Sequence, residues 1–395
     1  MIFTHRFFIV ANNVSGAEKR FFNAFKSAET AGLLINERLY HLYIQNGLLV
    51  PGSDTDSRIA VLKEGSMMRF LYEQLYRRQR LKSFYIFLQR VVVLFSLYAN
   101  RATLREVETL HAVLDGVRYI PFIRYLHPEA RCFASVVDPT LAFNVHKARL
   151  FGLQNCHHID SLNINIRSEL LRLGFDPARI SVTPASFTDY NIIGPGDKKP
   201  RVAFCARLIK PKNPLVFVDI ADRFAEKYPG TPVEFVVLGD GPLKADIDRR
   251  ITESTVLQKR ISAPGYVSRP ADVFAESLIF VQLSDTEIHG TQSMLEAMGT
   301  GCYIMVSHLE GIENVVKEDF GEILPLDATV FADHIKTRVD NFEATVKAGR
   351  EARRFGMQHF HVNNFLDYLF SVYAGAASLT TKYGMFKIVR LALVN

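Results

Sequence analysis

The sequence predicts an α/β protein with two domains, each built on a doubly wound parallel sheet. Short apolar runs alternate with amphipathic helical patterns along the chain, which is the order that parallel sheets with crossover helices require. The alternation restarts after 189–200, a stretch rich in Gly, Pro and charge that is the best linker candidate. We therefore expect a first domain at 1–192, a second domain at 193–375, and a tail at 376–395 that packs back on the first domain or contacts a membrane.

The composition is that of a folded protein with an anionic partner. The 395 residues are 48% hydrophobic and 22% charged, which allows full-size cores and argues against a disordered chain. The net charge of +6 fits a nucleotide, an anionic lipid head group or a nucleic acid. Four cysteines lack CxxC spacing and indicate buried thiols in a reducing compartment, without a zinc site; they are Cys132, Cys156, Cys205 and Cys302.

Neither a secretion signal nor a membrane-spanning segment is expected. Residues 1–10 lack the long apolar core and the small-residue cleavage site of a signal peptide. The nearest approach to a membrane span, 84–99, is interrupted by Gln89 and Arg90. We therefore expect a cytoplasmic protein.

The first half begins with an apolar run at 7–10, which predicts a strand. The stretch 12–20 follows and opens a helix that carries Phe21, Phe22 and Phe25. A small-residue loop at a helix N-terminus can present backbone N–H groups to an anion or a sugar, although an ordinary strand-to-helix turn fits equally well. Further strands are expected at 39–44, 117–123, 132–137 and 180–184, with a helix at 163–173.

Basic and aromatic side chains interleave at 67–105. The basic residues are Arg69, Arg77, Arg78, Arg80, Lys82, Arg90, Arg101 and Arg105. A basic amphipathic helix with aromatics can lie on an anionic membrane surface. A solvated basic face over a core-facing stripe fits the pattern equally well. Nucleic acid fits less well, because none of the named nucleic-acid modules is present.

The second half repeats the strand–helix alternation more regularly. Strands are expected at 202–206, 233–238, 278–283 and 302–306, and helices at 214–228, 244–254, 271–276, 292–299, 328–339, 341–356 and 362–374. Ile261 and Gly265 lie between the second and third of these strands. In such units ligands bind where loops leave the carboxyl ends of the strands.

Charged residues follow the strand ends of this half. Arg207 and Lys212 come directly after the first strand, where a guanidinium fork and an ammonium suit a diphosphate; two ordinary surface cations would be the interpretation if the pair stood alone. Glu287 lies in a later loop. Glu296 lies on an apolar helix face, where a carboxylate is costly unless a sugar or ribose hydroxyl, or a neighbouring backbone group, bonds to it.

Taken in order, these pieces resemble the retaining glycosyltransferases of family 4, which have the GT-B fold of two Rossmann-like domains facing a cleft. The resemblance is strong across 200–340 and thinner before 190. The matching segments are Ala206-Arg207-Leu208 with Lys212-Asn213, then 237–242, 265–267, 287–301, and Gly311 with Glu313; the loop 15–18 is similar to the family's Gly-Gly-Ala-Glu loop.

The resemblance implies roles for the charged residues. Arg207 and Lys212 would hold the nucleotide diphosphate and stabilise the charge that grows on it as it leaves. Glu296 would bind the ribose and Glu287 the donor sugar. No Asp-x-Asp motif of the metal-dependent sugar transferases is present, so we expect no metal and no cofactor beyond the nucleotide sugar.

Small residues are implicated by the same resemblance. Gly290 and Thr291 would supply backbone N–H groups near the phosphates at a helix N-terminus. Gly239 would belong to the same substrate site, and Gly16 would lie under the donor from the other domain.

Three features depart from the family pattern. Eight residues separate Glu287 from Glu296, where the family usually has seven. Asp138 stands where the family often has a His, and it is a candidate for acceptor-side chemistry. Ser15 replaces a loop glycine, which stiffens the approach to the donor.

We therefore expect a glycosyltransferase that moves a sugar from a nucleoside-diphosphate sugar to a glycan or lipid-linked acceptor, in surface polysaccharide or glycoconjugate synthesis. It would be peripheral on the inner membrane face, with 67–105 as the contact. Another enzyme of the same architecture, such as a soluble glucan synthase or a phosphorylase, is one rival. A non-catalytic GT-B relative that binds sugar nucleotide or a partner protein is the other.

Overall fold

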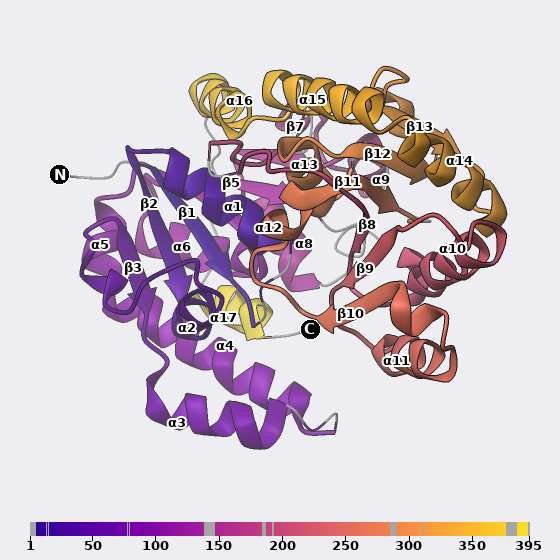
Figure 1. The fold of residues 1–395 in the computed structure, drawn as a ribbon. Coiled ribbons are helices and arrows are strands. Elements are labelled where there is room, and N and C mark those ends of the chain that lie inside the picture. The colour runs from indigo at the N-terminus through magenta and orange to yellow at the C-terminus, as the bar shows by residue number, and fades with distance from the viewer. Residues whose placement is uncertain are drawn as a thin grey trace. The chain divides into compact units, whose positions relative to one another are not determined.

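The computed structural model divides the chain into two compact α/β units (Figure 1). The first unit comprises Met1–Pro184 together with Phe365–Asn395, and the second comprises Ala185–Asn364. The structure describes residues 5–12, 14, 16–76, 78, 80–137, 147–183, 187–191, 193–284, 290–309, 311–376 and 385–393.

The first unit contains a seven-stranded sheet in the order β3-β2-β1-β4-β5-β6-β7, with every neighbouring pair parallel. Its strands are β1 (His5–Val10), β2 (Ala31–Asn36), β3 (Ile59–Leu62), β4 (Thr109–Leu114), β5 (Arg131–Val136), β6 (His158–Ser161) and β7 (Ile180–Val182). Its helices include α1 (Gly16–Ser27), α2 (Glu37–Gln45), α3 (Gly65–Leu71), α4 (Lys82–Ala99), α5 (Arg101–Arg105), α6 (Ile120–Leu126), α8 (Lys147–Gln154), α9 (Ile164–Arg172) and α17 (Met385–Leu393).

Two of the predicted strands in this unit were wrong. Residues 39–44 belong to helix α2, whose buried residues Leu39, Tyr40 and Tyr43 follow a helical spacing, and the strand β2 lies just before it. Residues 117–123 form the end of a 3-10 turn (Asp115–Tyr119) and the start of α6. Pro121 lies in the first turn of α6, where the N–H that proline lacks is not required.

The second unit contains a six-stranded parallel sheet in the order β10-β9-β8-β11-β12-β13. All four predicted strands are present, and two others, β10 and β13, were missed. The strands are β8 (Lys199–Cys205), β9 (Glu234–Leu238), β10 (Ile261–Gly265), β11 (Ser277–Gln282), β12 (Tyr303–Ser307) and β13 (Gly321–Leu324). The helices are α10 (Pro214–Lys227), α11 (Lys244–Glu253), α12 (Pro270–Glu276), α13 (Gln292–Gly299), α14 (Ala328–Asp340) and α15 (Phe342–His359), followed by α16 (Val362–Gly375), which runs into the first unit.

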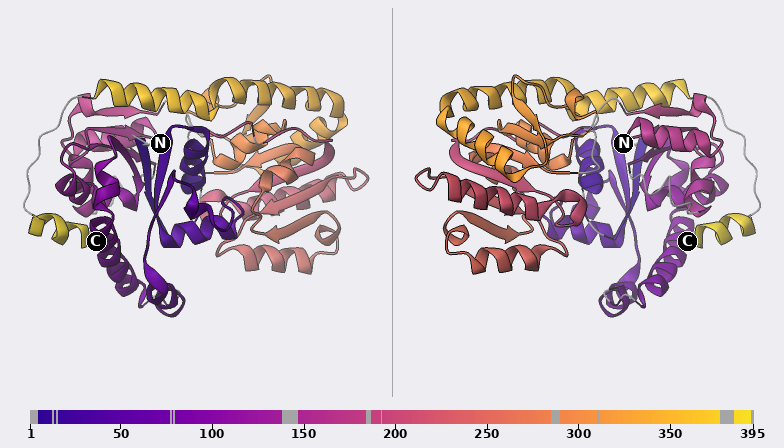
Figure 2. Two further views of the ribbon diagram at one scale, coloured as in Figure 1. Left: turned by 90° about the vertical axis from the view of Figure 1, so that its left-hand side faces the viewer. Right: turned by 90° about the vertical axis from the view of Figure 1, so that its right-hand side faces the viewer.

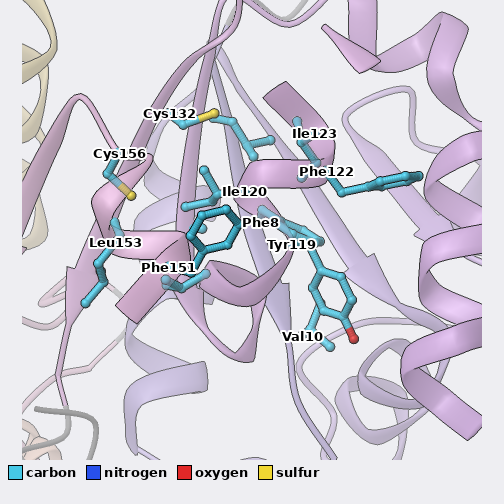
Figure 3. Close-up of a cluster of buried hydrophobic side chains, with 14 of the residues drawn as sticks. Phe8, Val10, Tyr119, Ile120, Phe122, Ile123, Cys132, Phe151, Leu153 and Cys156 are labelled. Carbon is cyan, nitrogen blue, oxygen red and sulfur yellow. The ribbon is translucent and has the colours of Figure 1, made fainter. Parts of the chain in front are cut away.

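Each unit has its own apolar core. In the first, Phe8 of β1 lies among Ile120 of α6 and Phe151 of α8 (Figure 3). Of the cysteines, Cys132, Cys156 and Cys302 are buried as predicted, and burial raises the pKa of the Cys132 thiol to about 12. The prediction was wrong for Cys205, which is only partly buried.

Helices α3 and α4 extend away from the sheet of the first unit as a hairpin (Figure 2). Among the described residues, α4 is the one helix long and apolar enough to cross a membrane. One face of its second half packs in the core through Val93 and Leu97, which are both fully buried. Its first half instead exposes Phe84 and Phe87.

A row of buried polar side chains crosses the sheet of the first unit beneath α16. His111 on β4 lies 2.8 Å from the hydroxyl oxygen of Ser135 on β5, which donates a 2.7 Å hydrogen bond to Asp160 on β6. From α16, Tyr368 donates to Asp160 at 2.7 Å and the Tyr373 hydroxyl lies 2.9 Å from Nδ1 of His111. Burial lowers the pKa of His111 to about 3, so the imidazole is neutral and this row is part of the core.

Candidate functional site

The candidate site lies at the carboxyl ends of the strands in the second unit. Strands β8 and β11 are neighbours at the centre of the sheet. The chain proceeds from β8 outward through β9 and β10, and from β11 outward on the other side through β12 and β13. The boundary between β8 and β11 is therefore the topological switch point, where open parallel sheets bind their ligands.

The two predicted diphosphate ligands lie on the loop after β8. Arg207 is exposed, two residues beyond the strand. Lys212 is partly buried at the end of a 3-10 turn, and its Nζ donates a long hydrogen bond of 3.5 Å to the hydroxyl oxygen of Ser284, just after β11. The side chain of Asn213 donates to the carbonyl of Leu283 at 3.1 Å. These two contacts hold the cation-bearing loop against the end of β11, across the switch point.

Gly239 allows the loops after β8 and β9 to touch. Its φ is +130°, and a Cβ added there would lie 1.9 Å from the carbonyl oxygen of Ala206. At Gly241, φ is +156° and a Cβ would lie 2.7 Å from the carbonyl oxygen of Leu208. The Leu208 N–H in turn donates to the carbonyl of Asp240 at 3.0 Å. A side chain at either glycine would push the cation-bearing loop out of place.

Gly290 and Thr291 precede helix α13. Gly290 is buried, with φ of +71°. Thr291 is the N-cap, since its hydroxyl oxygen accepts a 3.0 Å hydrogen bond from the Met294 N–H. Its own backbone N–H and hydroxyl both donate to the side-chain oxygen of Gln282, at 3.3 and 2.9 Å. The helix start is thereby fixed to the end of β11.

Glu296 lies in the second turn of α13 and is 3% exposed. One of its carboxylate oxygens lies 3.4 Å from the side-chain nitrogen of Gln292, which is one helical turn earlier. The same nitrogen donates to the hydroxyl of Thr188 at 2.7 Å. The carboxylate is therefore buried next to a polar side chain rather than among apolar groups alone.

The structure brings six of the predicted site residues to one edge of the second sheet: Arg207, Lys212, Gly239, Gly290, Thr291 and Glu296. Gly16 is the first residue of α1 in the first unit. Glu287 and Asp138 lie outside the described residues.

The sequence analysis did not mark Thr188, Gln282, Ser284 or Gln292 as parts of this region. Gln292 could have been found from its position four residues before Glu296, where side chains on a helix meet. Thr188 could not, because a residue so distant in sequence reaches α13 only through the tertiary fold. In the part of the chain that the structure describes, no group of three or more His, Cys, Asp or Glu side chains could hold a metal ion.

Two parallel α/β units are the arrangement of the GT-B fold, and the cations lie beside the switch point of the second. A family model supports the glycosyltransferase class. The family described as glycosyl transferases group 1 matches residues 199–341, from β8 through α14. The matched segment covers most of the second unit.

Curated relatives are similar over part of their length. The chain is 25% identical over 220 residues to the gpi3 subunit of phosphatidylinositol N-acetylglucosaminyltransferase from Schizosaccharomyces pombe, covering 51% of this chain and 47% of that protein. It is 29% identical over 183 residues to an Escherichia coli UDP-Gal:alpha-D-GlcNAc-diphosphoundecaprenol alpha-1,3-galactosyltransferase, covering 43% of this chain and 46% of that one. The chain thus matches about half the length of these relatives.

Solved structures share the fold over a longer span. Anabaena HepE, in complex with UDP and glucose, superimposes with a TM-score of 0.68 at 14% identity, covering 94% of this chain and 99% of that chain. S. aureus TarM, also solved with UDP, gives a TM-score of 0.58 at 18% identity and covers 72% of this chain and 59% of that chain. At these identities the likeness shows the GT-B fold.

Proposed function

We propose that the chain transfers a sugar from a nucleoside-diphosphate sugar to a glycan or lipid-linked acceptor, with retention at the anomeric carbon and without a metal. The observation that carries the proposal is the contact between Lys212 and Ser284 at 3.5 Å. It places an ammonium group at the switch point of the sheet, on the same loop as the exposed Arg207. The family match over 199–341 supports the reaction class.

The proposed chemistry depends on charge at the leaving group. When the anomeric bond breaks, negative charge grows on the diphosphate. Fixed cations there lower the barrier, because they are already oriented when the charge appears. Arg207 offers a planar fork for two phosphate oxygens and Lys212 offers a point charge. In this scheme Glu296 holds the ribose, while Glu287 contacts the donor sugar.

UDP is the first nucleotide to test. The HepE and TarM structures were both solved with UDP, and the E. coli relative is named for UDP-Gal. A thermal-shift screen would compare UDP, GDP, ADP and CMP, each with Mg²⁺ and with EDTA. A nucleotide at 100 times its Kd stabilises the folded state by about 2.7 kcal/mol. We expect one nucleoside diphosphate to raise the Tm equally with Mg²⁺ and with EDTA.

Single variants then test the cations. Arg207→Ala and Lys212→Ala should each reduce the nucleotide-induced shift in Tm. Lys210→Ala is the matched control, because Lys210 is an exposed lysine on the same 3-10 turn. Turnover with the matching UDP-sugars, followed by NMR of the product's anomeric proton, tests retention. No shift with any nucleotide would instead favour a non-catalytic relative that binds a partner protein.

The α3–α4 hairpin supports a membrane-bound acceptor and a cytoplasmic, peripheral location. Its exposed apolar side chains include Phe70, Phe84 and Phe87, at 64%, 55% and 43% exposure. The basic residues Arg69, Arg78, Arg80 and Lys82 lie on the same hairpin. Exposed aromatics with flanking cations suit the interface of an anionic bilayer. The yeast and E. coli relatives are named for lipid-linked substrates, phosphatidylinositol and diphosphoundecaprenol.

Liposome flotation would test the membrane contact. We expect binding to phosphatidylglycerol vesicles and weaker binding to phosphatidylcholine vesicles. The pair Arg78→Gln and Arg80→Gln, and the pair Phe84→Ser and Phe87→Ser, should each weaken it without changing the nucleotide-induced shift in Tm. Arg172→Gln, at an exposed arginine of α9 outside 67–105, is the control. Unchanged flotation of both pairs would contradict the membrane role.

A further inference from the structure

The chain enters and leaves the second unit through two segments that pair with each other. Thr188 lies shortly after the unit begins at Ala185, and His361 lies shortly before it ends at Asn364. The two residues form a parallel bridge. The Thr188 N–H donates to the carbonyl of Phe360 at 3.0 Å, and the Val362 N–H donates to the carbonyl of Thr188 at 2.9 Å. We call 187–191 and 360–364 the crossing segments.

Gln292 connects the crossing segments with Glu296. The side chains of Gln292, Thr188 and Glu296 are all buried, at 8%, 2% and 3% exposure. The Nε2 atom of Gln292 lies 2.7 Å from the Thr188 hydroxyl oxygen and 3.4 Å from a carboxylate oxygen of Glu296. An amide nitrogen carries two hydrogens, so it can donate to both acceptors at once.

The two donations fix which way the Gln292 amide points. Its Oε1 atom is buried and has no hydrogen-bond partner among the described side chains and backbone. Turning the amide over would place that oxygen against the Glu296 carboxylate, which offers no hydrogen when ionised. The side chain therefore keeps this orientation because Thr188 and Glu296 both accept from it. A change at one acceptor then alters the hydrogen bond from Gln292 to the other.

We propose that Gln292 is a positioning residue that couples nucleotide binding at Glu296 to the paired crossing segments. The inference rests on the proposed function, in which Glu296 binds the ribose. A ribose hydroxyl that donates to Glu296 restrains the carboxylate, and the restrained carboxylate holds Gln292 on the Thr188 hydroxyl. Opening of the paired crossing segments then becomes less favourable when the nucleotide is bound. By thermodynamic linkage, opening of the crossing segments must weaken nucleotide binding by the same factor by which the nucleotide disfavours their opening.

Hydrogen exchange of the full-length protein with and without UDP tests the coupling. In the wild type, we expect UDP to slow exchange of the Thr188 and Val362 amides by about fivefold or more, the lower end of usual coupling strengths. Gln292→Leu and Thr188→Val should abolish this slowing. Thr188→Ser keeps the hydroxyl and should retain the slowing. Gln258→Leu is the control, because Gln258 is an exposed glutamine of the same unit.

Two outcomes would overturn the inference, and they differ from each other. If UDP binds and slows the crossing segments equally in the wild type, Gln292→Leu and Thr188→Val, the coupling is absent while the proposed function stands. If none of the nucleoside diphosphates binds the wild type, both the inference and the proposed function are wrong. The Tm of each variant without nucleotide shows whether that variant is folded. If Gln292→Leu does not fold, Thr188→Val still tests the coupling.

Discussion

The hydroxyl of Tyr368 donates a hydrogen bond of 2.7 Å to the buried carboxylate of Asp160, and so joins residues that are 208 positions apart in the sequence. Asp160 also accepts from Ser135 and Thr183, at 2.7 and 2.8 Å. Burial raises the pKa of Asp160, while these three donors lower it. The hydrogen bonds therefore make a buried carboxylate tolerable in the core, and one of them comes from helix α16.

Tyr368→Phe should destabilise the first unit by about 1–3 kcal/mol, because it leaves a buried carboxylate with one donor fewer. Urea unfolding of the full chain, followed by far-UV circular dichroism, would measure the change. Tyr125→Phe is the matched control, since Tyr125 lies on α6 of the same unit and is 46% exposed. Equal midpoints for the two variants would show that the Asp160 contact contributes little.

Glu64 should make stability depend on pH. It accepts from Asn36 at 2.8 Å and from Gln89 at 3.1 Å, and burial raises its pKa from 4.5 to about 7. Between these two values the folded state holds a proton that the unfolded state has lost. The contribution of Glu64 to the free energy of unfolding is therefore fully present below pH 4.5, and it is lost as the pH rises to about 7.

Glu64→Gln removes this titration, so the variant should exceed the wild type by about 1–2 kcal/mol at pH 8, after discounting for partial exposure, and match it near pH 5. Urea unfolding midpoints at pH 5 and pH 8 would measure the difference in stability between the variant and the wild type. The control Glu318→Gln, at an exposed glutamate, should have the same midpoint as the wild type at both pH values. A gain that is equal at pH 5 and pH 8 would mean that Glu64 is ionised throughout.

Gly239→Ala should displace the loop after β8. The new Cβ would lie 1.9 Å from the carbonyl oxygen of Ala206, so the backbone must move. Strain of this kind costs on the order of 1–3 kcal/mol, and the nucleotide-induced shift in Tm should shrink as well. Gly230→Ala is the control, because a Cβ there meets nothing within 4 Å. Wild-type Tm and UDP affinity in Gly239→Ala would contradict the tight contact between the two loops.

Thr291→Ala should remove the N-cap of α13 at a cost of about 1 kcal/mol, and Thr291→Ser should recover most of it. Differential scanning calorimetry would measure the two changes. UDP titration of the same variants tests the predicted phosphate contact separately. If the backbone N–H of Thr291 serves the phosphates, Thr291→Ala and Thr291→Ser should both keep the wild-type affinity, because neither removes that N–H. If the UDP affinity falls in both variants, the contribution of Thr291 to UDP binding comes from its methyl group or from the loop conformation.

Most elements of the second unit were predicted from the sequence because they are periodic and clearly bounded; β10 and β13 were not predicted. Helix α13 has the predicted bounds, since Gly290 and Thr291 precede it and Gly301 follows it. In the first unit, helical residues such as Tyr40 and Tyr43 belong to a type that favours strands, and only their spacing against the core shows that they lie in a helix.

The candidate site was predicted as a set of strand ends, but its contacts were not. Motifs located Arg207, Lys212 and Glu296 because they follow strands or lie on an apolar helix face. The partners Ser284 and Thr188 carry no local signal, since each is a small hydroxyl residue in an irregular segment. Such long-range pairs are decided by the tertiary fold, as is the contact between Tyr368 and Asp160.

The division of the chain also fixes an order of events during synthesis. The second unit is one continuous segment, Ala185–Asn364, so it can fold as soon as it has left the ribosome. The first unit needs Phe365–Asn395 as well, including the tyrosines that bond to Asp160 and His111. Its seven strands are translated before the second unit, but their row of polar side chains is covered only after α16 has been translated. Of the two units, the one whose strands are translated first is therefore completed last.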